Sequence, residues 1–105
     1  MLFESLGLLP ELVRALSDKG YTEATAIQSQ AIPLIMNGED VLGGAQTGTG
    51  KTAAFTLPVL QRLIEHPNAK SKGPRVLILV PTRELAVQVH TSIREYAKHI
   101  RIRSA

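Results

Sequence analysis

The 105-residue sequence contains no cysteine and no long uncharged apolar segment. Without cysteine, the chain has no disulfide, no thiolate zinc site and no thiol nucleophile, as is common in proteins of a reducing compartment. No uncharged apolar run approaches the roughly 20 residues that a membrane-spanning helix needs. The apolar start, residues 1–9, carries Glu4 and has no basic flank of the kind a secretory signal shows. We therefore expect a cytoplasmic protein without a targeting segment or a membrane association.

The composition is that of a single globular domain. Apolar residues make up 44% and charged residues 20%, which excludes disordered and low-complexity classes. Charge is divided unevenly: residues 1–65 have four basic and seven acidic side chains (net −3), whereas residues 66–105 have eight and two (net +6). A basic part favours a polyanionic partner, although on charge alone a solvated basic surface is the better explanation.

Hydrophobic periodicity predicts alternating strands and helices. Helices are expected near residues 10–18, from Thr25 to a stop at Asn37-Gly38, near 51–65 and over 83–98. Short apolar runs predict strands at 41–44, at 75–80 and at the alternating end, 99–105, with an exposed loop at 66–74. This order predicts an α/β fold in which helices cover both faces of a parallel sheet.

Residues 45–52, AQTGTGKT, have the pattern of a phosphate-binding loop between a strand and a helix. The predicted nucleotide-binding residues are Ala45, Gln46, Thr47, Gly48, Thr49, Gly50, Lys51 and Thr52. Lys51 would reach the β- and γ-phosphates and Thr52 would hold Mg²⁺ through its hydroxyl, so these two carry the phosphate and metal chemistry. Ala45 stands where the strict pattern has glycine. The alternative is an ordinary glycine turn capped by Thr52.

Residues 20–28 contain a second candidate site. Thr25 and Gln28 have the spacing of a helix capping box, and taken alone this purely structural role is the better explanation. In the functional interpretation, the Gln28 amide pairs with N6 and N7 of adenine, as glutamine does on DNA. Tyr21 or Phe3 would then offer the base an aromatic face.

Together these segments resemble the start of a DEAD-box RNA helicase. Phe3 precedes Gly20 by seventeen positions, as the isolated aromatic residue precedes the family's Q motif. Three motifs follow in family order: the Q motif (Gly20, Tyr21, Thr25, Ile27, Gln28), motif I (45–52) and motif Ia (81–88, PTRELAVQ). Ala24 departs from the pattern, which usually has proline there. The resemblance implies a partial RecA-like P-loop domain, with a Q-motif helical region at 1–38 and the start of the ATP-binding domain at 39–105.

The resemblance also assigns RNA contacts to Pro81, Thr82 and Arg83 of motif Ia. A hydroxyl and free N–H groups at a helix start can face a phosphate, with the arginine charge beside them. Alternatively, Thr82 is only the N-cap of a helix that starts with an arginine, and without the resemblance this structural role is the better explanation. Contacts of this kind read the backbone, so sequence-independent RNA binding is expected.

Several parts of the family's machinery do not occur in these 105 residues. The DEAD tetrapeptide, the SAT motif and the second RecA-like domain are missing. The resemblance therefore implies a fragment that binds ATP and Mg²⁺ without turnover, whose partners are RNA and the remainder of its own helicase core. The full-length parent would couple ATP hydrolysis to local RNA unwinding. A different P-loop ATPase, a nucleotide kinase and a non-enzymatic RNA-binding module remain as alternatives.

Overall fold

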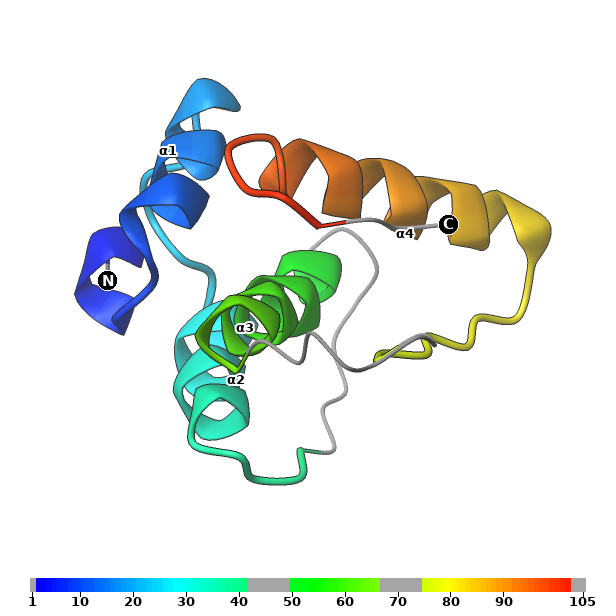
Figure 1. The fold of residues 1–105 in the computed structure, drawn as a ribbon, viewed down its shortest axis with the longest axis horizontal. Coiled ribbons are helices and arrows are strands. Elements are labelled where there is room, and N and C mark those ends of the chain that lie inside the picture. Colours follow the sequence, from blue (N-terminus) through cyan, green and yellow to red (C-terminus); the bar gives the residue numbers. More distant parts are fainter. Residues whose placement is uncertain (1, 42–49, 67–74, 103–105) are drawn as a thin grey trace.

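A computed structural model describes residues 2–41, 50–66 and 75–102. It contains a 3-10 turn, η1, and four α-helices (Figure 1). Their bounds are η1 Phe3–Leu6, α1 Pro10–Asp18, α2 Ala26–Met36, α3 Lys51–Glu65 and α4 Arg83–Tyr96. All four helices were predicted from the sequence, and α4 ends two residues earlier than expected.

Local signals account for the helix starts. Pro10 is the first residue of α1, where its missing N–H costs no helical hydrogen bond. Thr25 begins α2 with a capping box: its Oγ1 accepts from the Gln28 N–H at 3.4 Å, and Gln28 Oε1 accepts from the Thr25 N–H at 2.8 Å. Thr82 caps α4 by accepting from the Leu85 N–H at 3.1 Å. The predicted structural roles of Thr25 and Gln28 are thus present.

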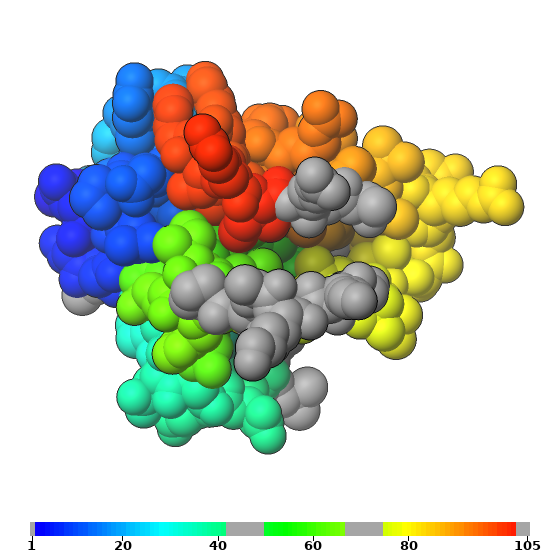
Figure 2. All heavy atoms as spheres, in the orientation of Figure 1, coloured from blue at the N-terminus to red at the C-terminus, as the bar shows by residue number. Residues whose placement is uncertain are grey.

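The core lies where η1, α1, α2 and α3 meet, with the end of α4 closing one side. Its buried side chains include Phe3, Leu12, Leu16, Ile32, Leu57, Leu60 and Tyr96. The buried Gln61 of α3 ties the N-terminal segment to this core, because it donates to the Gly7 carbonyl at 2.9 Å and accepts from the Leu9 N–H at 2.8 Å. Figure 2 shows the segment after α4 lying against the N-terminal part of the chain.

The predicted strand at 75–80 is not formed. Within the described residues there is no β-strand, and the structure has an isolated antiparallel bridge between Leu2 and Glu23. A strand needs a neighbour to accept and donate its ladder hydrogen bonds, and residues 75–80 have none among the described residues, so Leu77 and Leu79 remain 80% and 84% exposed. Of the two other predicted strands, Val41 and residues 99–102 are described and form no strand, whereas 42–44 and 103–105 lie outside the described residues. Of the predicted loop, His66 is described and 67–74 are not.

No helix in the described part of the chain is long and apolar enough to cross a membrane. Nor do the described residues bring three or more histidine or acidic side chains together as a metal site.

Candidate nucleotide site

Gln28 lies against the start of α3, although the two are 22 positions apart in sequence. Its Nε2 donates to the Gly50 carbonyl at 3.1 Å, while its Oε1 accepts from the Thr25 N–H. Gln28 is 5% exposed, and these two bonds hold its amide in a defined orientation. The residue predicted to read the base therefore contacts the last glycine of the predicted phosphate loop.

Gly50 is required at this contact for two reasons. Its φ of 84° lies in the left-handed region, which glycine adopts without a steric penalty. In addition, a Cβ at this position would lie 2.2 Å from Gln28 Nε2 and 3.3 Å from Thr25 Oγ1. The close approach of α2 to the start of α3 thus depends on the missing side chain.

The start of α3 suits an anionic group. Gly50 is the N-cap and has no side chain to bond the first-turn N–H groups, and such donors at the positive end of a helix bind anions well. Lys51 and Thr52 are the first two helical residues, with the lysine exposed and the threonine half-buried. These features fit a triphosphate with its metal. Residues 45–49 of the predicted loop lie outside the described residues.

The two aromatic candidates occupy different environments. Phe3 is 2% exposed and packs in the core, and its backbone N–H donates to the Thr22 carbonyl at 3.1 Å. Tyr21 is 48% exposed, and its backbone N–H donates to the Leu16 carbonyl at 2.9 Å. Of the two rings, that of Tyr21 has the open surface that a base could contact.

The motif Ia residues Pro81, Thr82 and Arg83 are all exposed at the N-terminal end of α4. The Thr82 hydroxyl caps the helix, as the structural alternative predicted. A hydroxyl that accepts this bond still has a hydrogen to donate, so capping and a phosphate contact are compatible. In Figure 1 this end of α4 lies away from α1, and the opposite end of α4 approaches it.

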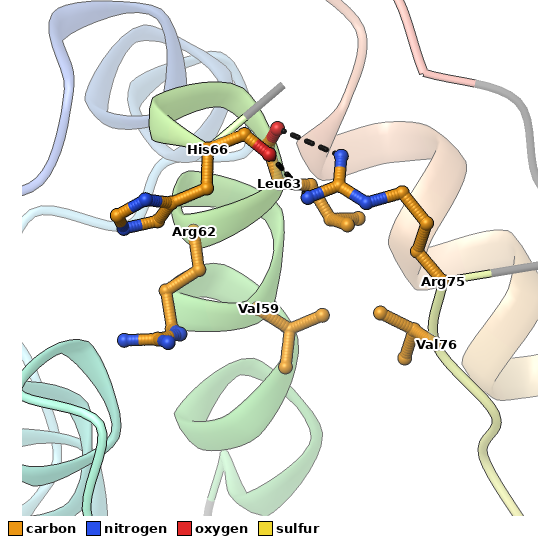
Figure 3. A pocket seen from close by; sticks show the side chains of 6 residues that line it. All are labelled: Val59, Arg62, Leu63, His66, Arg75 and Val76. Atoms are coloured by element: carbon orange, nitrogen blue, oxygen red, sulfur yellow. Dashed lines mark hydrogen bonds between the residues drawn. The ribbon is translucent and has the colours of Figure 1, made fainter. Parts of the chain in front are cut away.

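The pocket in Figure 3 is lined by Val59, Arg62, Leu63, His66, Arg75 and Val76. Arg75 donates to the Leu63 carbonyl at 3.3 Å and to the His66 carbonyl, so its cation caps the C-terminal end of α3. Arg62 donates to the Met36 carbonyl at 3.4 Å. These arginines satisfy helix-end carbonyls, and the pocket contains none of the predicted site residues.

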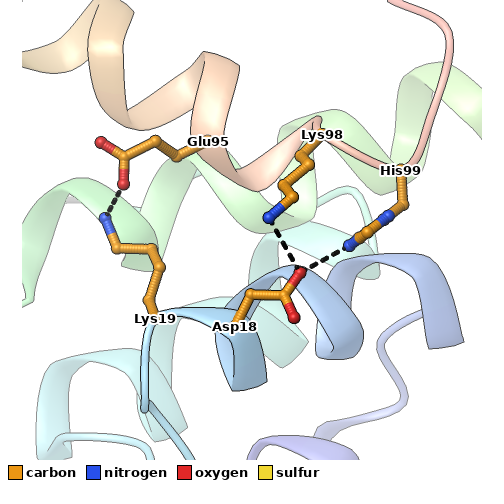
Figure 4. Close-up of polar contacts among 5 residues, drawn as sticks. All are labelled: Asp18, Lys19, Glu95, Lys98 and His99. Carbon is orange, nitrogen blue, oxygen red and sulfur yellow. Dashed lines mark hydrogen bonds and ion pairs between the residues drawn. The ribbon is translucent and has the colours of Figure 1, made fainter.

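Sequence reasoning did not find the polar junction between α1 and α4. Asp18 Oδ2 lies 2.7 Å from His99 Nε2 and 3.2 Å from Lys98 Nζ, and Lys19 pairs with Glu95 (Figure 4). The bonds from His99 and Lys98 lower the pKa of the Asp18 carboxyl, and the bond to Glu95 raises the pKa of Lys19. These partners are more than 70 positions apart, so no local pattern could have indicated them.

Comparisons with known proteins agree with these motifs. A family model described as DEAD/DEAH box helicase matches residues 25–105. The chain is 59% identical over 97 residues to the ATP-dependent RNA helicase SrmB of Escherichia coli strain K12, covering 92% of this chain and 22% of that protein. It is 50% identical over 99 residues to the ATP-dependent RNA helicase DeaD of the same strain, covering 94% and 15%.

A solved structure is similar as well. The RNA-helicase Prp28 from Chaetomium thermophilum bound to ADP superposes with a TM-score of 0.84 at 43% identity, covering 92% of this chain and 24% of that one. The chain therefore spans about a quarter or less of the length of these relatives.

Proposed function

Because the chain belongs to the DEAD/DEAH box helicase family, we propose that it is the ATP-binding N-terminal part of an ATP-dependent RNA helicase. The observation that carries this proposal is the bond from Gln28 Nε2 to the Gly50 carbonyl at 3.1 Å. It brings the base-reading residue to the start of the helix that opens with Lys51 and Thr52. A generic P-loop ATPase or nucleotide kinase gives no reason for this contact.

The Gln28 amide keeps the capacity to read adenine. A glutamine amide has two N–H donors and two acceptor lone pairs, and the bonds to Thr25 and Gly50 use one of each. One donor and one acceptor remain, which is what N7 and N6 of adenine require. Guanine presents an acceptor where adenine presents the N6 donor, so the same amide disfavours it. Tyr21, with its half-exposed ring, flanks the base, and Phe3 packs beneath the turn.

For the phosphates, we assign Lys51, Thr52 and the N–H groups at the start of α3, together with residues 45–49. Lys51 supplies a positive charge to the β- and γ-phosphates, and Thr52 supplies its hydroxyl to Mg²⁺. The magnesium neutralises charge on the triphosphate when bound. That the similar Prp28 structure is bound to ADP supports a nucleotide as the ligand of this chain.

RNA is the proposed second ligand, bound through its backbone at Pro81, Thr82 and Arg83. The N–H groups at the start of α4 and the Arg83 charge suit phosphate oxygens. Residues 39–105 would be the start of a RecA-like domain, and residues 1–38 the Q-motif region packed on it. The parallel sheet would form when residues 75–80 pair with strands from the rest of the helicase core. The RNA-remodelling activity would belong to the whole helicase.

Nucleotide titrations of the 105-residue chain test the proposal. Wild type should bind ATP with Mg²⁺ more tightly than GTP, and Lys51→Ala should abolish most of the affinity for both. Circular dichroism of each variant establishes that it is folded. Equal affinity for ATP and GTP would contradict the proposal and favour a different P-loop ATPase or a nucleotide kinase. ATP binding that survives Lys51→Ala would contradict it as well and favour a non-enzymatic module.

A further inference from the structure

The ammonium of Lys19 lies between two tyrosine rings. Its Nζ is 5.2 Å from the ring centroid of Tyr96 and 5.5 Å from that of Tyr21. Both distances fall within the range in which a cation is attracted to the face of an aromatic ring. The Glu95 carboxylate completes the surroundings of this charge (Figure 4).

The partners of Lys19 differ in how firmly they are held. Glu95 and Tyr96 belong to the last turn of α4, and Tyr96 is 5% exposed within the core. Burial of this ring also raises the pKa of its phenol. Lys19 itself is the C-cap of α1, with 23% of its side chain exposed. The lysine is thus fixed by a packed helix on one side.

Tyr21 lies on the open side. Gly20, with φ 79°, turns the chain out of α1, and the Tyr21 backbone is held by its bond to the Leu16 carbonyl. The ring, in contrast, is 48% exposed and has the Lys19 charge over one face. A half-exposed ring without such a contact would sample several rotamers, and binding a base would then cost the entropy of fixing it.

We propose that Lys19 is a positioning residue for the adenine base: anchored by Glu95 and Tyr96 of α4, it fixes the Tyr21 ring in the orientation that flanks the base. This inference rests on the proposed nucleotide site and adds a residue outside its motifs. It also makes the shape of the base site depend on the C-terminal end of α4, the helix whose other end carries motif Ia.

Base and phosphate binding can be separated with two probes, ATP and inorganic tripolyphosphate. Lys19→Met keeps most of the aliphatic stem and removes the charge. It should therefore weaken ATP binding about three- to tenfold and leave tripolyphosphate binding unchanged. Lys19→Arg restores a cation that stacks on aromatic rings and should recover most of the affinity. The matched control is Lys98→Met, which removes one positive charge and one ion pair from the same junction. It should change neither affinity.

A spectroscopic measurement reports on Tyr21 without any nucleotide. The chain has two tyrosines and no tryptophan, so in a Tyr96→Phe background Tyr21 is the sole tyrosine. Its near-UV circular dichroism should be strong when Lys19 or Arg is present and should collapse in Lys19→Met, whereas Lys98→Met should preserve it. Far-UV spectra confirm that the helices of each variant are intact.

The outcomes distinguish this inference from the function on which it rests. Suppose that wild type binds no ATP, but the circular dichroism of Tyr21 still depends on Lys19. The proposed nucleotide site is then wrong, and the inference is overturned because the fixed Tyr21 ring has no role in base binding. If wild type binds ATP and Lys19→Met leaves both ATP affinity and the Tyr21 signal unchanged, the inference alone is wrong. Parallel losses of ATP and tripolyphosphate affinity would also overturn it, because they indicate general damage to the fold.

Discussion

Gln28 and Gly50 are in close contact: the amide of Gln28 donates to the carbonyl of Gly50 at 3.1 Å, and a Cβ on Gly50 would lie 2.2 Å from Gln28 Nε2, so one of the two would have to move. The contact joins the first turn of α2 to the start of α3. It therefore links the orientation of the base-reading amide to the position of the phosphate-binding helix start.

Gly50→Ala is expected to damage both parts of the site. A non-glycine residue at φ 84° costs roughly 1–2 kcal/mol, and the new Cβ would also displace Gln28. The matched control is Gly7→Ala, because Gly7 has φ 80° and the atom that its Cβ would meet, Met36 Cε, lies at an ordinary contact distance of 3.8 Å. Chemical denaturation should show that the backbone conformation costs both variants a similar amount of stability. ATP titration should show a larger loss of ATP affinity for Gly50→Ala. Equal ATP affinities would argue against the close contact.

Gln28→Ala should remove most of the preference for ATP over GTP. An amide paired to a base is worth about 1 to 3 kcal/mol of discrimination. The variant also loses the capping box, which by itself costs about 0.5–2 kcal/mol of stability. Thr25→Ala breaks the same cap and leaves the amide in place. Chemical denaturation should therefore show reduced stability in both variants, whereas competition titrations should show a lost base preference in Gln28→Ala alone. A base preference retained by Gln28→Ala would show that another group reads the base.

Arg83→Ala should weaken RNA binding alike for all sequences. Arg83 is exposed at the first position of α4, where its contacts would go to phosphates. Log affinity falls as log salt concentration rises, and removing one phosphate contact should make this slope less steep by roughly 0.7–0.9. Fluorescence anisotropy with several single-stranded RNAs across a salt series checks this. Arg94→Ala, in the last turn of the same helix, is the control and should change affinity less. Strong preference for one base sequence would contradict the assignment.

ATP turnover by the 105-residue chain should not exceed background. Lys51 and Thr52 can hold the triphosphate, but no carboxylate of the matched motifs is placed to orient the attacking water. A phosphate-release assay, with and without RNA, measures this, and Lys51→Ala serves as the control for contaminating ATPase. RNA-stimulated release that disappears in Lys51→Ala would show that the chain already contains a water-positioning group.

Acid should weaken the junction between α1 and α4 through Asp18. The folded-state pKa of Asp18 lies below its usual value of 3.8 because His99 and Lys98 bond its carboxylate. The ionised group therefore stabilises the folded state above that value, and the contribution is lost as pH falls through the folded-state pKa. Wild type should exceed Asp18→Asn in stability at about pH 5, and the difference should shrink toward about pH 3. Urea titrations followed by circular dichroism measure this; a constant difference would exclude the carboxylate as its cause.

The sequence by itself determined the helices, their caps and the family. A capping box, a side-chain N-cap and an N-terminal proline act within a few residues, so Thr25, Thr82 and Pro10 could be assigned their structural roles without coordinates. The motifs of the family are equally local, and their order along the chain suffices to recognise it.

Tertiary structure decided what depends on residues far apart in the chain. It placed Gln28 on Gly50, buried Phe3 while leaving Tyr21 open, and paired Lys19 with Glu95 across 76 positions. It also left residues 75–80 without a paired strand among the described residues, contrary to their strand-like sequence. The physical reason is common to all four: a local pattern specifies a backbone preference, but burial and pairing are set by which distant surfaces meet, and a strand exists only when its neighbour is present.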